Sequence, residues 1–245
     1  LNVMILGKNG SLTDTILTAT INPKLKTVSL INFPRDLLVN GRKLNEIYSK
    51  FGIEKLAENI YEISGMIPER YLVMDFEGFK EIINAIGGIE MHVEQDIVDK
   101  HYPGPNYSYI TFSVNKGLQH FDGETALRYT RSRKSSSDFD RAKRQQQVFE
   151  AVMDKIKSTD VFTQDLNKSY QLYTSLTANL DSNVDALQAL AFFNEYKTYT
   201  LEKNNVISTG NFLDSTQNEA GQYVLLPKNG NFDQIKEYVR KVIEQ

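Results

Sequence analysis

Cationic side chains are concentrated in one short stretch of this 245-residue chain, around "TRSRKSSSDFDRAKRQQQ" at residues 130–147. The chain as a whole is slightly acidic, with 28 Lys+Arg against 31 Asp+Glu. Between Arg128 and Arg144 there are nevertheless seven cations and two acids; the cations are Arg128, Arg131, Arg133, Lys134, Arg141, Lys143 and Arg144. Most of them are arginines, whose planar guanidinium forks match phosphate oxygens. Phosphate binding is therefore one chemistry that the stretch could perform.

Three interpretations of this stretch compete: a solvated charged helix face, a patch for nucleic acid, and a pocket for phosphate. Nucleic acid is the weakest, because no nucleic-acid-binding motif occurs and the rest of the chain is acidic. Arg131 and Arg133 stand at i and i+2, so on an extended segment they project to one side. A helix start at about Asp138 would add free N–H groups in the same place, which favours an anion there.

Helical spacing distinguishes two faces over residues 138–157. One face is apolar and carries Val148, Phe149, Val152 and Ile156, and the opposite face carries Lys143, Gln147, Glu150 and Asp154. Arg141 and Gln145 fall on the apolar side, so we expect both to point toward the protein body. A buried arginine needs a partner or a cavity. Two roles for Arg141 are therefore possible: phosphate binding, or a structural ion pair, for example with Asp138 as the helix N-cap.

A second group of polar residues follows the first strands. "LGKNGSLTDT" places Asn9 after one predicted strand and Asp14 before the next, so the two would share a sheet edge. "FPRD" places Arg35 and Asp36 where a third strand ends. The order of a phosphate-binding Walker loop is absent from this segment. A site at the rim of the sheet and local structural contacts both fit these residues.

Other reaction types lack their residues. The chain has no cysteine, and its three histidines (His92, His101 and His120) show no metal-ligand spacing. No Gly-x-Ser-x-Gly elbow occurs, so a covalent intermediate is not expected. Phosphoryl transfer needs none, because positioning with Arg and Mg²⁺ stabilisation can carry most of it.

The elements that must position these residues alternate between strands and helices. Short strands are expected at 2–7, 15–21, 27–33, 71–76, 89–93, 109–114, 199–207 and 223–226. Helices are expected at about 43–64, 77–86, 122–130, 138–157, 161–178, 183–195 and 232–243, and residues 96–108 read as a turn-rich loop. This alternation predicts an α/β fold, an α/β/α layered sandwich with a central mixed sheet.

Composition and length indicate one soluble globular domain over residues 1–245. The 40% hydrophobic and 24% charged residues exclude disordered and fibrous classes. No segment reaches the roughly 20 apolar residues that span a bilayer. Core motifs lie in residues 1–157, and residues 158–245 form a C-terminal helical and strand-helix part of the same domain.

Several motifs, taken in order, resemble the LytR-CpsA-Psr family of bacterial cell-wall assembly proteins. They are "LTDT", "FPRDLLV", "KLNEIY", "GGIEMHV", "GLQHFDGETALRYTRSR" and "DFDRAKRQQQ". The resemblance implies a phosphotransferase that moves a glycan polymer, such as a teichoic acid or a capsule polysaccharide, from a polyprenyl-diphosphate carrier to peptidoglycan. It also implies Mg²⁺, an extracytoplasmic location, and a single transmembrane anchor upstream of Leu1.

The resemblance also implies roles for individual residues. By position, the family's diphosphate-binding set corresponds to Arg35, Arg131, Arg133, Arg141 and Gln145. Asp14 corresponds to a metal-associated aspartate, with Asn9 as a second position beside the metal. The catalytic residues expected from this correspondence are Asp14, Arg35 and Arg141.

Two positions depart from the family pattern. Asn9 stands where the family usually has Asp, and Leu12 stands where it usually has Arg. Loss of a carboxylate should weaken Mg²⁺ binding, because hard cations prefer charged oxygen ligands. A catalytically weakened polyprenyl-phosphate or glycan binding protein is therefore one alternative to the transferase. A lipid diphosphate hydrolase, in which water replaces the sugar hydroxyl, is another.

Overall fold

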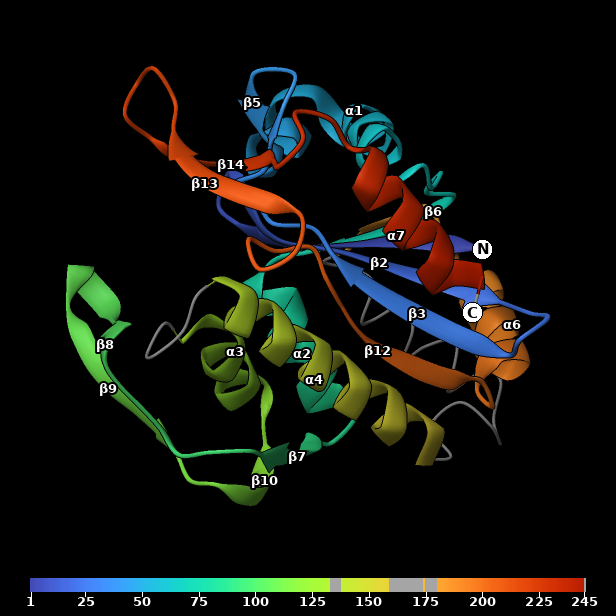
Figure 1. The fold of residues 1–245 in the computed structure, drawn as a ribbon. Coiled ribbons are helices and arrows are strands. Elements are labelled where there is room, and N and C mark those ends of the chain that lie inside the picture. The colour runs from blue at the N-terminus through green and yellow to red at the C-terminus, as the bar shows by residue number, and fades with distance from the viewer. Residues whose placement is uncertain (133–137, 159–173, 175–179, 245) are drawn as a thin grey trace. The chain divides into compact units, whose positions relative to one another are not determined.

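The computed structural model describes residues 1–132, 138–158, 174 and 180–244 (Figure 1). The chain divides into two compact units, which are described separately. Unit 1 consists of Leu1–Asp75 and Leu180–Gln245, and unit 2 of Phe76–Asn179. The single domain expected over residues 1–245 stays a prediction. Among the helices that the structure describes, none has the length and apolar character needed to cross a membrane.

A six-stranded mixed sheet forms the centre of unit 1, in the order β11-β6-β1-β2-β3-β12 (Figure 1). Its strands are β1 (Asn2–Asn9), β2 (Leu12–Asn22), β3 (Thr27–Asn32), β6 (Arg70–Met74), β11 (Asp181–Ser182) and β12 (Thr200–Val206). Strands β1, β2 and β3 are antiparallel neighbours, whereas β6 runs parallel to β1 and β12 parallel to β3. The β-branched and aliphatic residues of β1–β3 suit such buried strands. The predicted α/β class with a central mixed sheet is confirmed.

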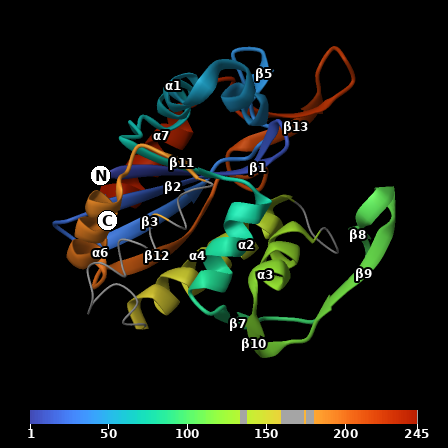
Figure 2. The same ribbon diagram turned by 180° about the vertical axis from the view of Figure 1, so that it is seen from behind.

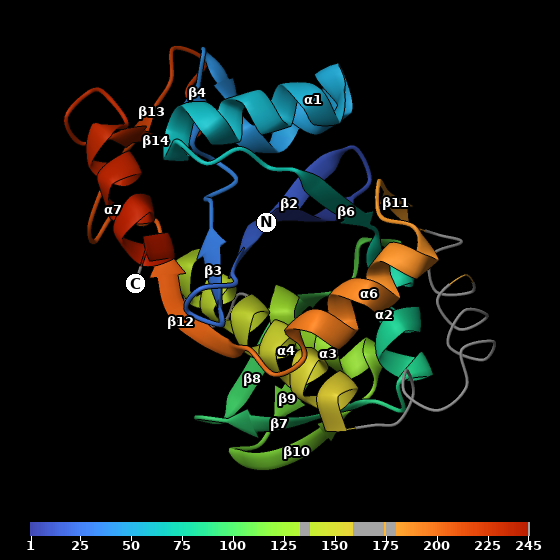
Figure 3. The ribbon, with the colours of Figure 1, turned by 90° about the vertical axis from the view of Figure 1, so that its right-hand side faces the viewer.

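Helices cover both faces of this sheet. Figure 3 shows α1 (Leu44–Ser64) and α7 (Asp233–Glu244) on one side and α6 (Ala186–Tyr196) on the other. In α1 the spacing of Leu56, Ile60 and Ile63 places three fully buried side chains on one face. The helix ends at Gly65, whose left-handed backbone (φ 73°) lets its N–H donate to a carbonyl of the last turn. The predicted helix boundary at Gly65 is therefore confirmed.

Two short hairpins complete unit 1. One pairs β4 (Leu38–Val39) with β5 (Arg42–Lys43), and the other pairs β13 (Leu213–Gln217) with β14 (Tyr223–Pro227). Only β14 was expected from the sequence. The β14 strand also forms a parallel bridge from Leu225 to Leu37, which ties the hairpin to the segment after β3.

In the part of unit 2 that the structure describes, three α-helices accompany two strand pairs (Figure 2). The helices are α2 (Phe76–Ala85), α3 (Gly123–Arg131) and α4 (Asp138–Ser158). The pairs are β7 (Ile89–Val93) with β10 (Gly117–Phe121) and β8 (Ile97–Pro103) with β9 (Tyr109–Val114), both antiparallel. A core of apolar side chains from all these elements includes Ile83, Met91, Phe112, Phe121, Tyr129 and Val148.

The first turn of α3 lies close against α2 and is capped as predicted. The side chain of Asp122 accepts a hydrogen bond from the Thr125 N–H at 2.8 Å. A Cβ at Gly123 would lie 2.3 Å from the Lys80 carbonyl oxygen, so only glycine permits this approach. Because both contacts act at the start of α3, the direction of the helix is set there.

Residues 96–108 were expected to form a loop, and this expectation is wrong for 97–103. That segment is β8, which pairs with β9 and buries Asp99 and Tyr102. A register shift between Asp99 and Tyr102 breaks the alternation of side chains, so no period-2 pattern is visible in the sequence. Apart from residue 174, the helix expected at 161–178 lies outside the described residues.

Candidate functional site

The backbone after β3 is held by hydrogen bonds from two other elements of unit 1. The N–H of Asn45, in the first turn of α1, donates to the Arg35 carbonyl at 2.9 Å. The N–H of Leu225, in β14, donates to the Asp36 carbonyl at 3.0 Å. The backbone carbonyls of Arg35 and Asp36 are thereby satisfied, and the side chains of these two residues start from a well-defined position.

Arg35 lies between two carboxylates. Its Nη1 donates to Asp14 Oδ1 at 2.6 Å, and its Nε donates to Asp36 Oδ2 at 3.3 Å. Lys43 Nζ donates to the second oxygen of Asp36 at 2.8 Å, and Asn9 Nδ2 donates to the second oxygen of Asp14 at 3.1 Å. These five residues are the strand-end cluster. The structure thus brings Asn9 and Asp14 together at one edge of the sheet, as predicted.

Burial and charge balance describe the strand-end cluster further. The Asp36 side chain is 9% exposed, whereas those of Arg35 and Asp14 are 19% and 22% exposed. Two cations face two carboxylates, so the cluster is close to neutral. A phosphate oxygen that approached Arg35 would therefore compete with carboxylates that already hold its donors.

The cluster offers a small donor set for a divalent cation. Among the described residues, no group of three or more His, Asp or Glu side chains is arranged to hold a metal ion. Mg²⁺ is commonly bound through one or two carboxylates together with substrate phosphates. Asp14 and the amide oxygen of Asn9, once that amide turns, fit this arrangement. The residues therefore fit an ion that the substrate's phosphates help to hold.

A second group of polar residues lies in unit 2, at the end of α3 and the first turns of α4. We call Arg131, Ser132, Arg141, Arg144 and Gln145 the helix-end cluster. The Arg131 guanidinium lies 4.1 Å from the ring centroid of Phe76 and 5.7 Å from that of Tyr102. Its Nη1 also donates to the Tyr102 hydroxyl oxygen over a long 3.4 Å. Among the described residues, the contacts that hold this cation are aromatic rings and a tyrosine hydroxyl.

Arg144 is buried and contacts backbone oxygens. Its Nε donates to the Tyr129 carbonyl at 3.0 Å, and its Nη2 donates to the Ser132 carbonyl. Both oxygens belong to the C-terminal end of α3, where helix carbonyls lack intrahelical partners. Burial lowers the pKa of Arg144 from its ordinary value, an effect that nearby acidic groups oppose.

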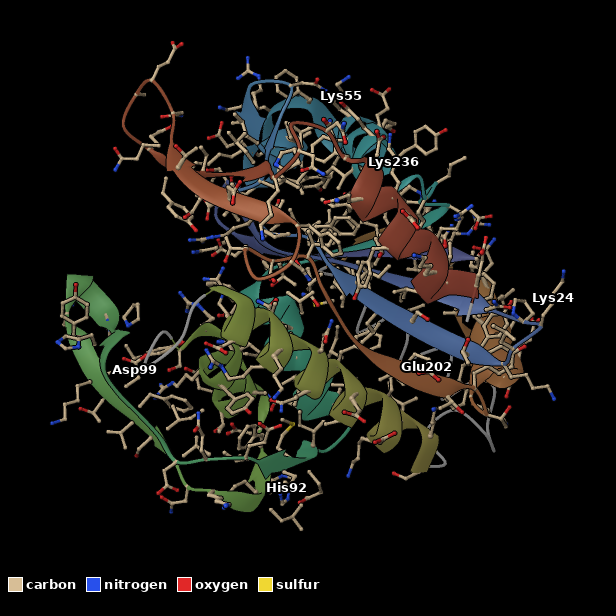
Figure 4. The ribbon with its side chains drawn as sticks, viewed as in Figure 1. Lys24, Lys55, His92, Asp99, Glu202 and Lys236 are labelled. Atoms are coloured by element: carbon tan, nitrogen blue, oxygen red, sulfur yellow. The ribbon has the colours of Figure 1, made fainter. Side chains whose placement is uncertain are left out.

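Asp99 is a buried carboxylate beside the same helix end, and it is labelled on β8 in Figure 4. Its Oδ2 accepts from the Ser132 hydroxyl at 2.8 Å, and its Oδ1 accepts from the His101 N–H at 3.0 Å. Residue 132 is therefore contacted from two sides, by β8 at its hydroxyl and by α4 at its carbonyl.

Comparison with known proteins now places the chain. The model of the LytR-CpsA-Psr family (LytR_cpsA_psr) matches residues 1–241. This chain belongs to the LytR-CpsA-Psr family. The resemblance inferred from the motifs is thereby confirmed, and the match extends beyond the motif-bearing residues 1–157 into the C-terminal part.

Relatives in this family include cell-wall transferases. The chain is 28% identical over 242 residues to the polyisoprenyl-teichoic acid–peptidoglycan teichoic acid transferase TagV of Bacillus subtilis strain 168, covering 94% of this chain and 60% of TagV. It covers 62% of the TagT transferase of the same organism. The chain therefore spans about three fifths of the length of these curated relatives.

Solved structures agree on the fold. The crystal structure of B. subtilis TagV matches with a TM-score of 0.77 and 25% identity, covering 100% of this chain and 97% of that one. A structure of TagT bound to LIIa-WTA matches with a TM-score of 0.78 and 23% identity, covering 100% of this chain and 91% of the TagT chain. At that lower identity the second match shows the fold alone.

The residues expected from the LytR-CpsA-Psr pattern divide between the two units. Asn9, Asp14 and Arg35 lie in unit 1, in the strand-end cluster. Arg131, Arg141 and Gln145 lie in unit 2, in the helix-end cluster. Arg133 lies outside the described residues. The functional roles of all these residues stay predictions.

The predicted orientation of α4 is largely confirmed. Arg141 is 8% exposed and thus points inward, and Gln145 is half-buried. The Lys143 side chain is 57% exposed and pairs with Glu94 at 3.1 Å, so it lies on the outer face as expected. The side chain of Asp138 is outside the described residues, so its role as helix N-cap stays a prediction.

Sequence reasoning missed Arg144 and Asp99. Arg144 stands four residues before Val148 on the same helical face, so the spacing that identified Arg141 could also have identified it. Asp99 gave no such signal, because its strand was read as a loop. Its partner Ser132 is 33 residues away along the chain.

Proposed function

We propose that this protein is a phosphotransferase that moves a glycan polymer from a polyprenyl-diphosphate carrier to peptidoglycan. The observation that carries the proposal is the family match over residues 1–241. Relatives that cover most of this chain are named as polyisoprenyl-teichoic acid–peptidoglycan teichoic acid transferases, which supports a glycan of that class.

In this proposal the arginines bind and orient the diphosphate. Arg131 suits the task because the rings of Phe76 and Tyr102 hold its guanidinium while using few of its five N–H donors. Arg141 starts from the inner face of α4, in the same cluster. In unit 1, Arg35 is oriented by Asp14 and Asp36, so its charge is held in one direction before substrate arrives.

The transfer itself exchanges one phosphate bond for another. A hydroxyl oxygen of peptidoglycan forms a bond to the phosphorus next to the glycan and loses its proton. The bridging P–O bond breaks, and polyprenyl phosphate leaves with the electron pair. Guanidinium groups stabilise the charge that gathers on the phosphate oxygens, so no covalent enzyme intermediate is required. Mg²⁺, held by Asp14 with Asn9 and the substrate's phosphates, would neutralise further charge when bound.

The proposal includes a location outside the cytoplasmic membrane. We propose one transmembrane helix upstream of Leu1 in the complete gene product, with the described residues on the extracytoplasmic face. The full reading frame tests this directly: a hydrophobic segment of about 20 residues is expected before Leu1. A reading frame without such a segment would contradict the anchor.

A transfer assay tests the activity. Purified protein is incubated with a polyprenyl-diphosphate-linked glycan, Mg²⁺ and peptidoglycan, and glycan attached to peptidoglycan is measured. We expect Arg35→Ala to abolish the product. Lys55→Ala should still form it, because Lys55 is an exposed residue that pairs with its neighbour Glu58. If no glycan is attached to peptidoglycan and the polyprenyl-diphosphate-linked glycan remains intact, the proposed transferase activity is contradicted.

A binding protein without turnover is the second candidate. It is favoured by Asn9, a neutral amide beside Asp14, and by the apolar Leu12, which is 40% exposed on β2. Lipid binding without any product would support this candidate. Release of polyprenyl phosphate and free glycan phosphate without peptidoglycan would instead indicate a diphosphate hydrolase, in which water replaces the hydroxyl.

A further inference from the structure

We propose that Asp99, Ser132 and Arg144 are positioning residues that hold the end of α3 and thereby orient Arg131 toward the diphosphate. We call these three residues the α3-end network. The inference rests on the proposed function for the identity of the ligand. It assigns a role to a buried carboxylate, Asp99, and a buried guanidinium, Arg144, which the transfer reaction itself does not use.

Arg144 acts on the backbone of the helix end. A buried guanidinium is costly unless its donors are satisfied, and here two of its nitrogens donate to the carbonyls of Tyr129 and Ser132. These are oxygens at the negative end of the α3 dipole, where a cation is favourable. Since Arg144 belongs to α4, the contact joins the start of one helix to the end of another.

Asp99 acts on the side chain of the same residue. Its carboxylate accepts from the Ser132 hydroxyl at 2.8 Å, and a backbone N–H within β8 holds its other oxygen. The acid is 5% exposed and Ser132 is 1% exposed, so water cannot easily replace this contact. A hydrogen bond from a hydroxyl to a charged acceptor in a buried place is strong and directional.

Strand β8 also contacts the neighbouring arginine. Tyr102, three residues after Asp99, provides one of the two rings beside the Arg131 guanidinium and accepts its hydrogen bond. The same strand therefore holds the backbone position through Asp99 and the side-chain direction through Tyr102. Displacement of Ser132 would move the Arg131 guanidinium away from these rings. The N–H groups that Arg131 offers to phosphate would move with it.

Ser132→Ala removes the hydroxyl with little change in volume, and Ser132→Thr restores it. Asp99→Asn keeps the shape of the acid but not its charge, and Arg144→Lys keeps a charge that cannot reach both carbonyls as a fork. Lys143→Ala is the matched control, because this exposed neighbour lies on the outer face of α4.

Binding of farnesyl diphosphate, a short soluble polyprenyl diphosphate, is measured by calorimetry below the melting temperature of every variant. Ser132→Ala, Asp99→Asn and Arg144→Lys should each weaken binding about tenfold, the effect of one misplaced charge-assisted contact. Ser132→Thr and Lys143→Ala should bind as the wild type does. Amide exchange of Ser132, whose N–H donates to the Arg128 carbonyl at 2.9 Å, should accelerate in the three weakened variants.

A purely structural role predicts something else: lower melting temperatures with unchanged affinity in the folded variants. That result would overturn the inference while leaving the proposed function intact. Wild-type protein that fails to bind farnesyl diphosphate would contradict the proposed function instead. In that case the exchange data decide: unchanged protection of the Ser132 amide in Arg144→Lys and Ser132→Ala would also overturn the positioning role, and accelerated exchange would support it.

Discussion

Arg35 in the strand-end cluster and Arg131 in the helix-end cluster are held by different means. In unit 1 Arg35 is paired with the carboxylates of Asp14 and Asp36. In unit 2 Arg131 lies against the rings of Phe76 and Tyr102, and Arg144 donates to backbone carbonyls. Carboxylates cancel charge, whereas aromatic rings orient a cation without cancelling it. An arginine held by rings keeps more of its attraction for phosphate.

The largest effect on stability is expected where the strand-end cluster is broken. Asp36→Ala would remove the buried carboxylate that Arg35 and Lys43 share, so the free energy of unfolding should fall by about 3 kcal/mol. Chemical denaturation measures this loss. Glu58→Ala removes an exposed partner of Lys55 and should change stability by less than about 1 kcal/mol. Equal losses of unfolding free energy in Asp36→Ala and Glu58→Ala would mean that burial does not make the first ion pair stronger than the second.

The next effect concerns ligand affinity in the helix-end cluster. Arg141→Ala should weaken polyprenyl-diphosphate binding by about tenfold to a hundredfold, the value of one charge-assisted contact to phosphate. Lys143→Ala, on the exposed face of α4, should change affinity little. Binding isotherms and melting curves on both variants test this. A collapsed melting temperature for Arg141→Ala would instead indicate a structural ion pair.

Asn9→Asp should sharpen the difference between the clusters by adding a carboxylate to the strand-end cluster. A second negative charge about 4 Å from a divalent cation favours binding by about 2 kcal/mol even at the dielectric constant of water, or more than tenfold in affinity. Titration of Mg²⁺ in the presence of a diphosphate lipid measures the gain. An unchanged affinity would place Asn9 outside the coordination shell of the metal.

The smallest effect is expected at the start of α3, the helix that carries Arg131. Asp122→Ala removes the cap to Thr125 and should lower stability by about 1 kcal/mol, whereas Asp122→Asn keeps an acceptor and should lose less. The hydrogen bonds from Thr125 lower the pKa of Asp122, so its contribution is present above the ordinary carboxyl pKa and is lost as pH falls through the lowered one. Unfolding at neutral and acid pH tests this; a pH-independent difference would contradict it.

Local patterns in the sequence predicted the elements that bear the site. The aliphatic runs of β1–β3, the glycine at residue 65 and the cap at Asp122 act within a few neighbours, so each could be read directly. The inward direction of Arg141 followed from helical periodicity alone. The cationic stretch indicated phosphate, and the order of the motifs indicated the family that the comparison then showed.

Only the tertiary structure decided which partners hold these side chains. Arg35 contacts Asp14 across 21 residues of sequence, and Ser132 contacts Asp99 across 33. Such contacts depend on strand pairing and register, which bring distant segments together and leave no local period in the chain. The sequence by itself therefore determined the chemistry and the elements of this protein. The fold decided that carboxylates hold one arginine and aromatic rings hold the other.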